Sequence, residues 1–226
     1  MISLVVAMIA FLAGHFVLSH PLRARLVRAW GLKPFLTVYS LLAIVTLTWV
    51  AIAYHSAPQQ PLLWDSYAVA PWIGASVLTY LALVLFLASL GGNPALPGAR
   101  VAGLSAIWPK GVFQITRHPM MMGIALASVA HFLVTPSPRG AVLNGGITLL
   151  ALGGAHLQDR KKDALHGRDW RAWMKRTPFW PRLQHMHRLR RYWALAVLPW
   201  LAFTWLHNPL AHLPAGIWRW VDAANW

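Results

Sequence analysis

Cysteine is absent from this 226-residue chain. Its absence excludes disulfides, thiolate catalysis, iron–sulfur clusters, cysteine-based zinc sites and covalent c-type haem attachment. Glutamate is absent too, and the five acidic residues are all aspartates. The sequence therefore offers few side chains for catalysis by paired carboxylates or for carboxylate-rich metal sites. The 11 histidines are left as the abundant side chains for chemistry.

Charged residues are scarce as well, at 11% of the chain, against about 25% in a soluble domain. Hydrophobic residues make up 58%, and the mean hydropathy is +0.49. So few polar side chains do not cover a water-facing surface, and the composition predicts an integral membrane protein. The net charge of +15 then favours contact between cytoplasmic loops and anionic lipids. No nucleic acid partner is expected, because the chain offers no solvated basic domain.

Apolar runs that cross about 30 Å of hydrocarbon need about 20 residues each. Six candidate runs cover residues 2–18, 34–54, 71–90, 118–135, 141–156 and 192–207. We therefore predict an all-α, polytopic helical bundle that forms one integral membrane domain over residues 1–226. Residues 157–191 are expected to form a basic cytoplasmic loop, with a short amphipathic helix at residues 169–175 lying on the membrane surface.

Lysine and arginine predict the orientation of these runs. All of them except Arg139 and Arg219 fall in the connections after the first, third and fifth runs. Cytoplasmic loops carry the excess of basic residues, so this distribution places both termini outside the cytoplasm. Most of the 14 tryptophans cluster near the ends of the runs, as expected of interfacial aromatic belts.

Ionisable groups inside an apolar run are functional candidates, because their burial in hydrocarbon is costly. His15 in the first run and His131 in the fourth fit this description best. A neutral imidazole in that position needs a helix partner, a water molecule or a metal, and it ligates haem iron without any cysteine. The alternative is a core histidine that donates to a backbone carbonyl or a hydroxyl. His55 and His207, at outer ends of runs, are expected to be interfacial.

Arg117, His118 and Pro119 form a second candidate site. Pro119 suits the first turn of a helix, where free backbone N–H groups attract an anion, and Arg117 adds a forked donor. The group bound there could be a haem propionate, a cofactor carboxylate or a lipid phosphate. The alternative is an interfacial arginine that only anchors its helix.

Several stretches resemble the NnrU family of bacterial membrane proteins, which is linked to denitrification and nitric oxide metabolism. The resemblance covers most of residues 10–165, and its most specific part is Thr-Arg-His-Pro-Met at residues 116–120, followed by His131. The other stretches are residues 11–15, 36–40, 92–94 and 157–162. NnrU proteins are similar to the plant-type 15-cis-zeta-carotene isomerase, a haem-b membrane enzyme. The resemblance thus implies a bacterial inner-membrane protein. Its implied role is in denitrification or nitric oxide metabolism, or in the isomerisation of a lipophilic small molecule.

Carried over residue by residue, the resemblance implies haem b as cofactor. His15 and His131 match the proposed iron ligands, and His118 matches the Arg-His-Pro histidine. Arg117 would anchor a propionate. His15 and His131 are expected to differ by about 15–20 Å in depth, because each helical residue rises about 1.5 Å. By depth, His15 pairs more naturally with His118 or His156.

Two other functions remain open at this point. A wider resemblance to isoprenylcysteine carboxyl methyltransferases implies an enzyme that uses S-adenosylmethionine, with Arg117 and His118 on the cofactor. The acidic pair expected in that family is missing, because the chain has no glutamate. The third function is a non-enzymatic assembly factor for a denitrification reductase.

Overall fold

The computed structural model describes residues 1–96 and 98–222, and every regular element within them is helical. The α-helices are α1 (Ile2–Ser19), α2 (Arg23–Trp30), α3 (Leu32–Ser56), α4 (Val69–Ser89), α5 (Pro119–Val134), α6 (Pro138–His166), α7 (Arg168–Arg176), α8 (Arg190–Ala211) and α9 (Trp218–Asp222). Short 3-10 helices, η1 (Leu104–Ala106), η2 (Gly111–Gln114) and η3 (Leu183–Leu189), lie in the connections on either side of α5–α7. The all-α prediction is confirmed for the described residues.

Four helices, α1, α3, α4 and α6, are long and apolar enough to cross a membrane. The other two predicted runs are also helical but do not meet these criteria. Helix α5 has only 16 residues, or about 24 Å of rise. Helix α8 begins with Arg190 and Arg191 and contains Pro199 and Pro209. The structure thus supports four of the six predicted crossings by length and composition, and it gives no orientation.

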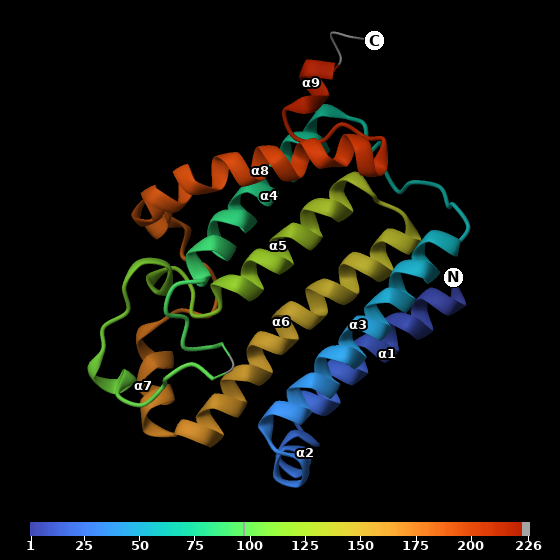
Figure 1. Cartoon of the computed structure of the whole chain (residues 1–226). Coiled ribbons are helices and arrows are strands. Elements are labelled where there is room, and N and C mark those ends of the chain that lie inside the picture. Colours follow the sequence, from blue (N-terminus) through green and yellow to red (C-terminus); the bar gives the residue numbers. More distant parts are fainter. Residues whose placement is uncertain (97, 223–226) are drawn as a thin grey trace.

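The helices pack as two groups that meet between α5 and α6 (Figure 1). Helices α1 and α3 lie side by side, with α6 against α1, and their shared core includes Leu4, Phe11 and Val50. Helix α4 packs against both α5 and α8. The outward face of α3 is apolar, with Ile44 60% exposed and Val45 64% exposed. Such a surface suits lipid rather than water.

Glycine permits the closest helix contact in the second group. A Cβ atom at Gly123 on α5 would lie 2.7 Å from the carbonyl oxygen of Ala82 on α4. Likewise, the missing side chain of Gly146 on α6 leaves room for the Met8 side chain of α1. These contacts agree with the role of small residues at helix interfaces in membranes.

The segment expected as a loop over residues 157–191 is more ordered than the sequence indicated. Helix α6 continues without a break to His166, so the polar residues 157–166 extend an apolar helix. The expected amphipathic helix is present as α7. Its tryptophans do not lie on a membrane surface, however. Trp170 and Trp173 are buried among protein side chains, where they complete the core beside α4 and η1.

Candidate functional site

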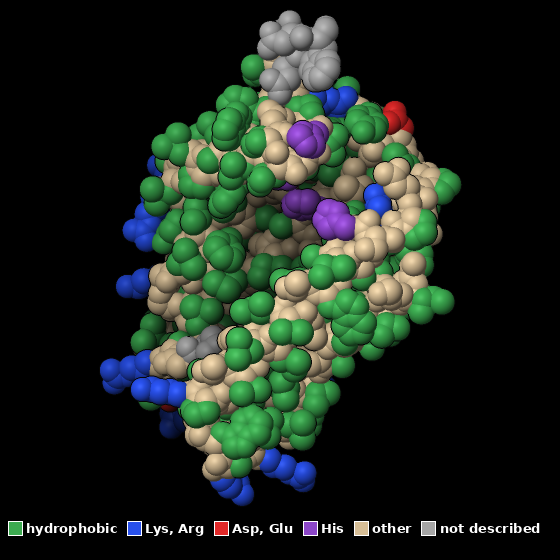
Figure 2. All heavy atoms as spheres, turned by 45° about the vertical axis from the view of Figure 1, so that its right-hand side comes forward, with side chains coloured by type: hydrophobic (Ala, Val, Ile, Leu, Met, Phe, Trp, Pro, Cys, Tyr) green, Lys and Arg blue, Asp and Glu red, His purple; other side chains and the backbone are tan. Residues whose placement is uncertain are grey.

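A cavity of about 770 Å³ lies between α4, α5 and α8. Most of its lining is apolar, and the segment over residues 213–216 contributes to it. Figure 2 shows a deep hollow among hydrophobic side chains, with histidines at its rim. This size and lining are typical of sites that enclose a small ligand.

Two histidines from different helices meet in this cavity. His131 on α5 and His207 on α8 both line it, and their ring centroids are 6.3 Å apart. Each Nδ1–H donates to the carbonyl four residues earlier, at 2.7 Å from His131 to Ala127 and 2.8 Å from His207 to Phe203. A carbonyl only accepts, so Nδ1 carries the proton in both rings. In the neutral imidazoles, both Nε2 lone pairs are therefore available to a metal or a donor.

Two unpaired donors lie near the start of α4. Arg219 stacks on the ring of Trp72, which lines the cavity, at 4.7 Å, and it also donates to the carbonyl of Tyr67. Among the described residues, neither Arg219 Nη1 nor Trp72 Nε1 has a hydrogen-bond partner, although both atoms are buried. Buried donors without acceptors are costly, so this pair of donors beside the cavity is suited to an acidic group on a ligand.

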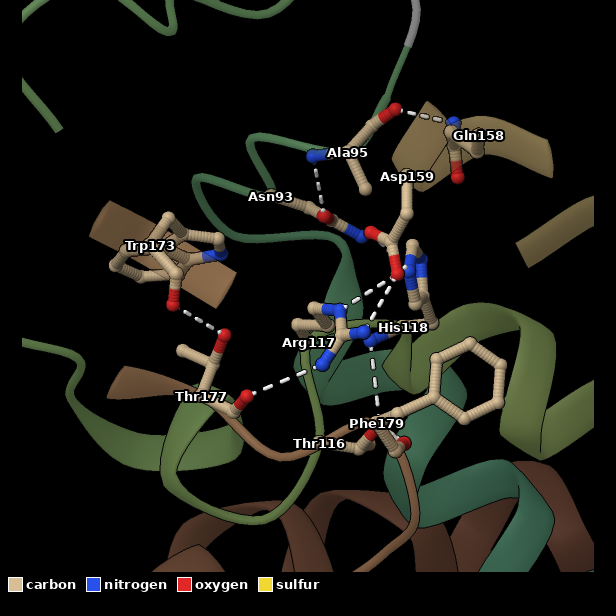
Figure 3. A network of polar contacts seen from close by, with 10 residues as sticks. All are labelled: Asn93, Ala95, Thr116, Arg117, His118, Gln158, Asp159, Trp173, Thr177 and Phe179. Atoms are coloured by element: carbon tan, nitrogen blue, oxygen red, sulfur yellow. Dashed lines mark hydrogen bonds and ion pairs between the residues drawn. The ribbon is translucent and has the colours of Figure 1, made fainter. Parts of the chain in front are cut away.

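Arg117 and His118 meet a carboxylate far along the chain (Figure 3). The Arg117 guanidinium forms an ion pair with Asp159 Oδ2 at 2.6 Å, and its Nη1–H donates to the Thr177 carbonyl at 3.2 Å. His118 Nε2–H donates to Asp159 Oδ1 at 2.9 Å. Asp159 lies near the end of α6, and all three side chains are largely buried.

Backbone contacts fix this network in place. The segment before α5 pairs with the segment after α7: Arg117 N–H donates to the Pro178 carbonyl, and Arg182 N–H donates to the Ile115 carbonyl. The Phe179 ring packs against both Arg117 and His118. Because a charged pair is buried here with its hydrogen bonds made, the arrangement holds α5, α6 and the chain after α7 together.

His15 occupies a third environment. Its Nδ1–H donates to the Phe11 carbonyl at 2.8 Å, as those of His131 and His207 do to their own helices. Its ring contacts Phe11 and Tyr39, whose ring centroid is 5.4 Å away. His15 does not belong to the lining of the cavity that holds His131. The described residues contain no group of three or more potential metal-ligating side chains, so His15, His118 and His131 are not gathered into one cluster.

Sequence reasoning missed two residues of these sites. His207 was expected to be interfacial, yet it faces His131 inside the cavity. Asp159 was assigned no partner, yet it is the shared partner of Arg117 and His118. No sequence spacing indicates either pairing, because each joins residues from separate helices. The only signal in the sequence was the small number of carboxylates. A buried arginine needs a carboxylate partner, and the chain offers five aspartates.

Comparison with known proteins matches residues 3–215 of this chain to the family described as NnrU protein. Neither the curated proteins nor the solved structures contain a match.

Proposed function

This chain belongs to the NnrU family, and we propose that it is a membrane protein that holds haem b in the cavity between α5 and α8. The observation that supports this proposal is the pair of imidazoles, His131 and His207, inside an apolar cavity. Bound haem would serve nitric oxide or denitrification metabolism, or the isomerisation of a lipophilic substrate.

The geometry of the histidine pair fits a shared iron. With metal–nitrogen bonds of about 2.0–2.1 Å, two imidazoles that share one metal would have ring centres on the order of 6 Å apart. The centroid distance of 6.3 Å between His131 and His207 agrees with this value. Their Nδ1–H bonds to Ala127 and Phe203 fix both rings with Nε2 available, as is usual for metal-ligating histidines. The pairing of His15 with His131 that the resemblance implies, and the pairing of His15 with His118 or His156 that depth favours, have no comparable geometric support.

Haem carries two propionates, and two donors lie beside the cavity: Trp72 belongs to its lining, and Arg219 stacks on Trp72. Arg219 Nη1–H and Trp72 Nε1–H are both buried and unpaired. Arg117, the anchor expected from the sequence, already pairs with Asp159. We therefore assign the propionate contacts to Arg219 and Trp72, and a positioning role for α5 to Arg117 and His118.

Haem supplies an iron centre that binds small molecules or exchanges an electron. The protein's part is to hold and isolate it. His131 and His207 orient the cofactor, the apolar side chains of α4 and α8 exclude water, and the cavity opening admits a small or lipophilic partner. The reaction is thereby confined to a region of low dielectric.

The test is an absorption spectrum and a pyridine haemochrome assay on detergent-purified protein. We expect a Soret band with about one haem b per chain. His131→Ala should abolish or shift this band. His15→Ala is the matched control, because His15 makes the same Nδ1–H bond to its own helix outside the cavity, and it should leave the spectrum unchanged. Wild-type protein that stays free of haem after reconstitution would refute the proposal.

The methyltransferase alternative has less support. It requires Arg117 and His118 to grip S-adenosylmethionine, whereas both side chains are engaged by Asp159. Calorimetry with S-adenosylmethionine decides between the two functions, and we expect no binding. An assembly factor for a denitrification reductase would use the same haem site, and its sign would be co-purification with that reductase.

We also propose that α5 and α8 complete six crossings of a bacterial inner membrane, with both termini outside the cytoplasm. The basic residues at the start of α8 and around α7 support this orientation. Because the chain has no cysteine, single introduced cysteines report topology without background. A maleimide that does not cross membranes should label Gln59→Cys in intact cells and Lys175→Cys only after permeabilisation. The reverse pattern would invert the orientation.

A further inference from the structure

A second cavity, of about 850 Å³, lies at the end of the molecule that carries α7. It is bounded by the end of α4, residues 91–94 and 100–113 of the following connection, Trp173 of α7 and the start of α8. It shares no lining residue with the cavity of His131 and His207. The proposed haem site therefore does not account for it.

The lining of this second cavity is strongly basic. Four cationic side chains contribute to it, and none of its lining residues is acidic. The four are Arg100, Lys110, Arg188 and Arg191. The ion pairs of the described residues engage Arg117, His118 and Arg171, so none of them neutralises this set. The carboxylate of Asp169 accepts from the backbone N–H groups of Gly103, which lines the cavity, and Ser105, and it pairs with none of the four cations.

Two of these four cations already donate a hydrogen bond to a side chain, but each has further N–H groups. Arg188 Nη1–H donates to Gln114 Oε1 at 2.6 Å, and Arg191 Nη2–H donates to the hydroxyl of Tyr192. A guanidinium carries five N–H groups, so each arginine keeps several for another acceptor. Like charges gathered without a counter-ion repel each other, and a bound anion removes that repulsion.

Open space and an unpaired donor in this second cavity also favour a bound ligand. Gly92, Gly103 and Gly111 line the cavity with positive φ angles, and a Cβ atom at any of them would meet nothing within 4 Å. The indole Nε1 of Trp173 is buried without a partner among the described residues. An oxygen-rich ligand would supply the missing acceptor.

The position of the cavity identifies the source of the anion. Ile107 and Trp108 belong to its lining and are 52% and 72% exposed. Exposed tryptophan beside exposed aliphatic side chains is typical of the membrane–water interface. A ligand here meets cations at its head and apolar side chains along its body. We propose that this cavity binds the phosphate group of an anionic amphiphile, with the phosphate on Arg100, Lys110, Arg188 and Arg191 and the apolar chain along Ile107 and Trp108.

The probe is dioctanoyl phosphatidic acid, titrated by calorimetry into the full-length protein in a neutral detergent. The double variant Arg100→Gln/Lys110→Gln should bind it about tenfold more weakly, because two of the four charge-assisted contacts are lost. The matched control is Arg25→Gln/Arg28→Gln on the exposed helix α2, which makes the same change in net charge. This control should retain affinity within about twofold, since its charges lie outside the cavity. Both doubles should retain the wild-type absorption spectrum.

A second measurement needs no variant. Acetylation of lysines in the wild-type protein, read by mass spectrometry, should fall about threefold at Lys110 when the phosphatidic acid is present, because charge-assisted contact shields the amine. Lys175, on the exposed side of α7, should react equally with and without it. Inorganic phosphate in place of the lipid distinguishes the two sources of the anion. If phosphate protects Lys110 and the lipid does not, the anion site stands but its ligand is a soluble phosphate. Equal losses of affinity in the two double variants, equal protection of Lys110 and Lys175, or no binding of either probe would overturn the proposal.

Discussion

His131 on α5 and His207 on α8 place their imidazole rings 6.3 Å apart across an apolar cavity. Each ring is held by an Nδ1–H bond to its own helix, so the pair depends on helix positions and not on a bond between the rings. Helix α4 sets those positions, because it packs against both α5 and α8. Changes that move α4 should therefore alter the histidine pair at a distance.

Replacing His207 tests the proposed haem site. His131 and His207 would both hold the iron, so we expect His207→Ala to shift the absorption bands of bound haem rather than simply abolish them. Added imidazole should reverse this shift, because it would supply the donor nitrogen that the variant lacks. His55→Ala, in the last turn of α3, is the control and should have no effect. A His207→Ala protein with an unchanged spectrum would exclude His207 as a ligand.

Removal of the Asp159 carboxylate should destabilise the whole fold. Asp159→Asn leaves the Arg117 guanidinium buried without its counter-ion, which typically costs roughly 3–5 kcal/mol. The thermal unfolding midpoint in detergent should fall accordingly. Asp163→Asn, one turn later on α6, is the matched control. Its pair with Arg171 is 3.5 Å long and more exposed, so its removal should cost less than about 1 kcal/mol.

A methyl group at Gly123 should force α4 and α5 apart. The added Cβ atom would lie 2.7 Å from the backbone oxygen of Ala82, which has no flexible side chain to move aside. We expect Gly123→Ala to cost about 1–3 kcal/mol of stability and to weaken haem retention, since Gly123 also lines the cavity. Gly145→Ala meets nothing within 4 Å and should be neutral or slightly stabilising. Similar losses in both variants would argue against a specific contact.

Acid should loosen the contact between α7 and η1 through Asp169. A side-chain hydrogen bond from Ser105, with the backbone N–H groups of Gly103 and Ser105, lowers the pKa of this carboxyl below its ordinary value. The stabilisation is therefore present above the unfolded-state pKa of about 3.9 and is lost as pH falls through the lower, folded-state pKa. Thermal unfolding between pH 6 and pH 3 should show this loss. Asp169→Ala should flatten that part of the profile, and a profile identical to wild type would contradict the assignment.

The sequence was sufficient for everything that follows from composition and short-range pattern. The scarcity of charge predicted a membrane protein, and the apolar runs predicted helices at the right places, although α6 extends well past the predicted end at residue 156. The polar residues 157–166 were assigned to a loop because hydropathy marks where lipid ends, not where a helix ends. Polar side chains do not stop a helix when Asp159 and Lys162 have partners in the protein.

The tertiary structure alone decided which residues share a site. Sequence reasoning selected His15, His118 and His131 because each is an ionisable group in an apolar context, and the fold distributes them over three environments. It brings His207 to His131 and Asp159 to Arg117 instead. Composition and periodicity determine whether a helix forms and which medium surrounds it, since both depend on residues close in the chain. Contacts between side chains of different helices depend on how far each helix is rotated and shifted against its neighbours, and packing at positions such as Gly123 and Ala82 fixes those quantities.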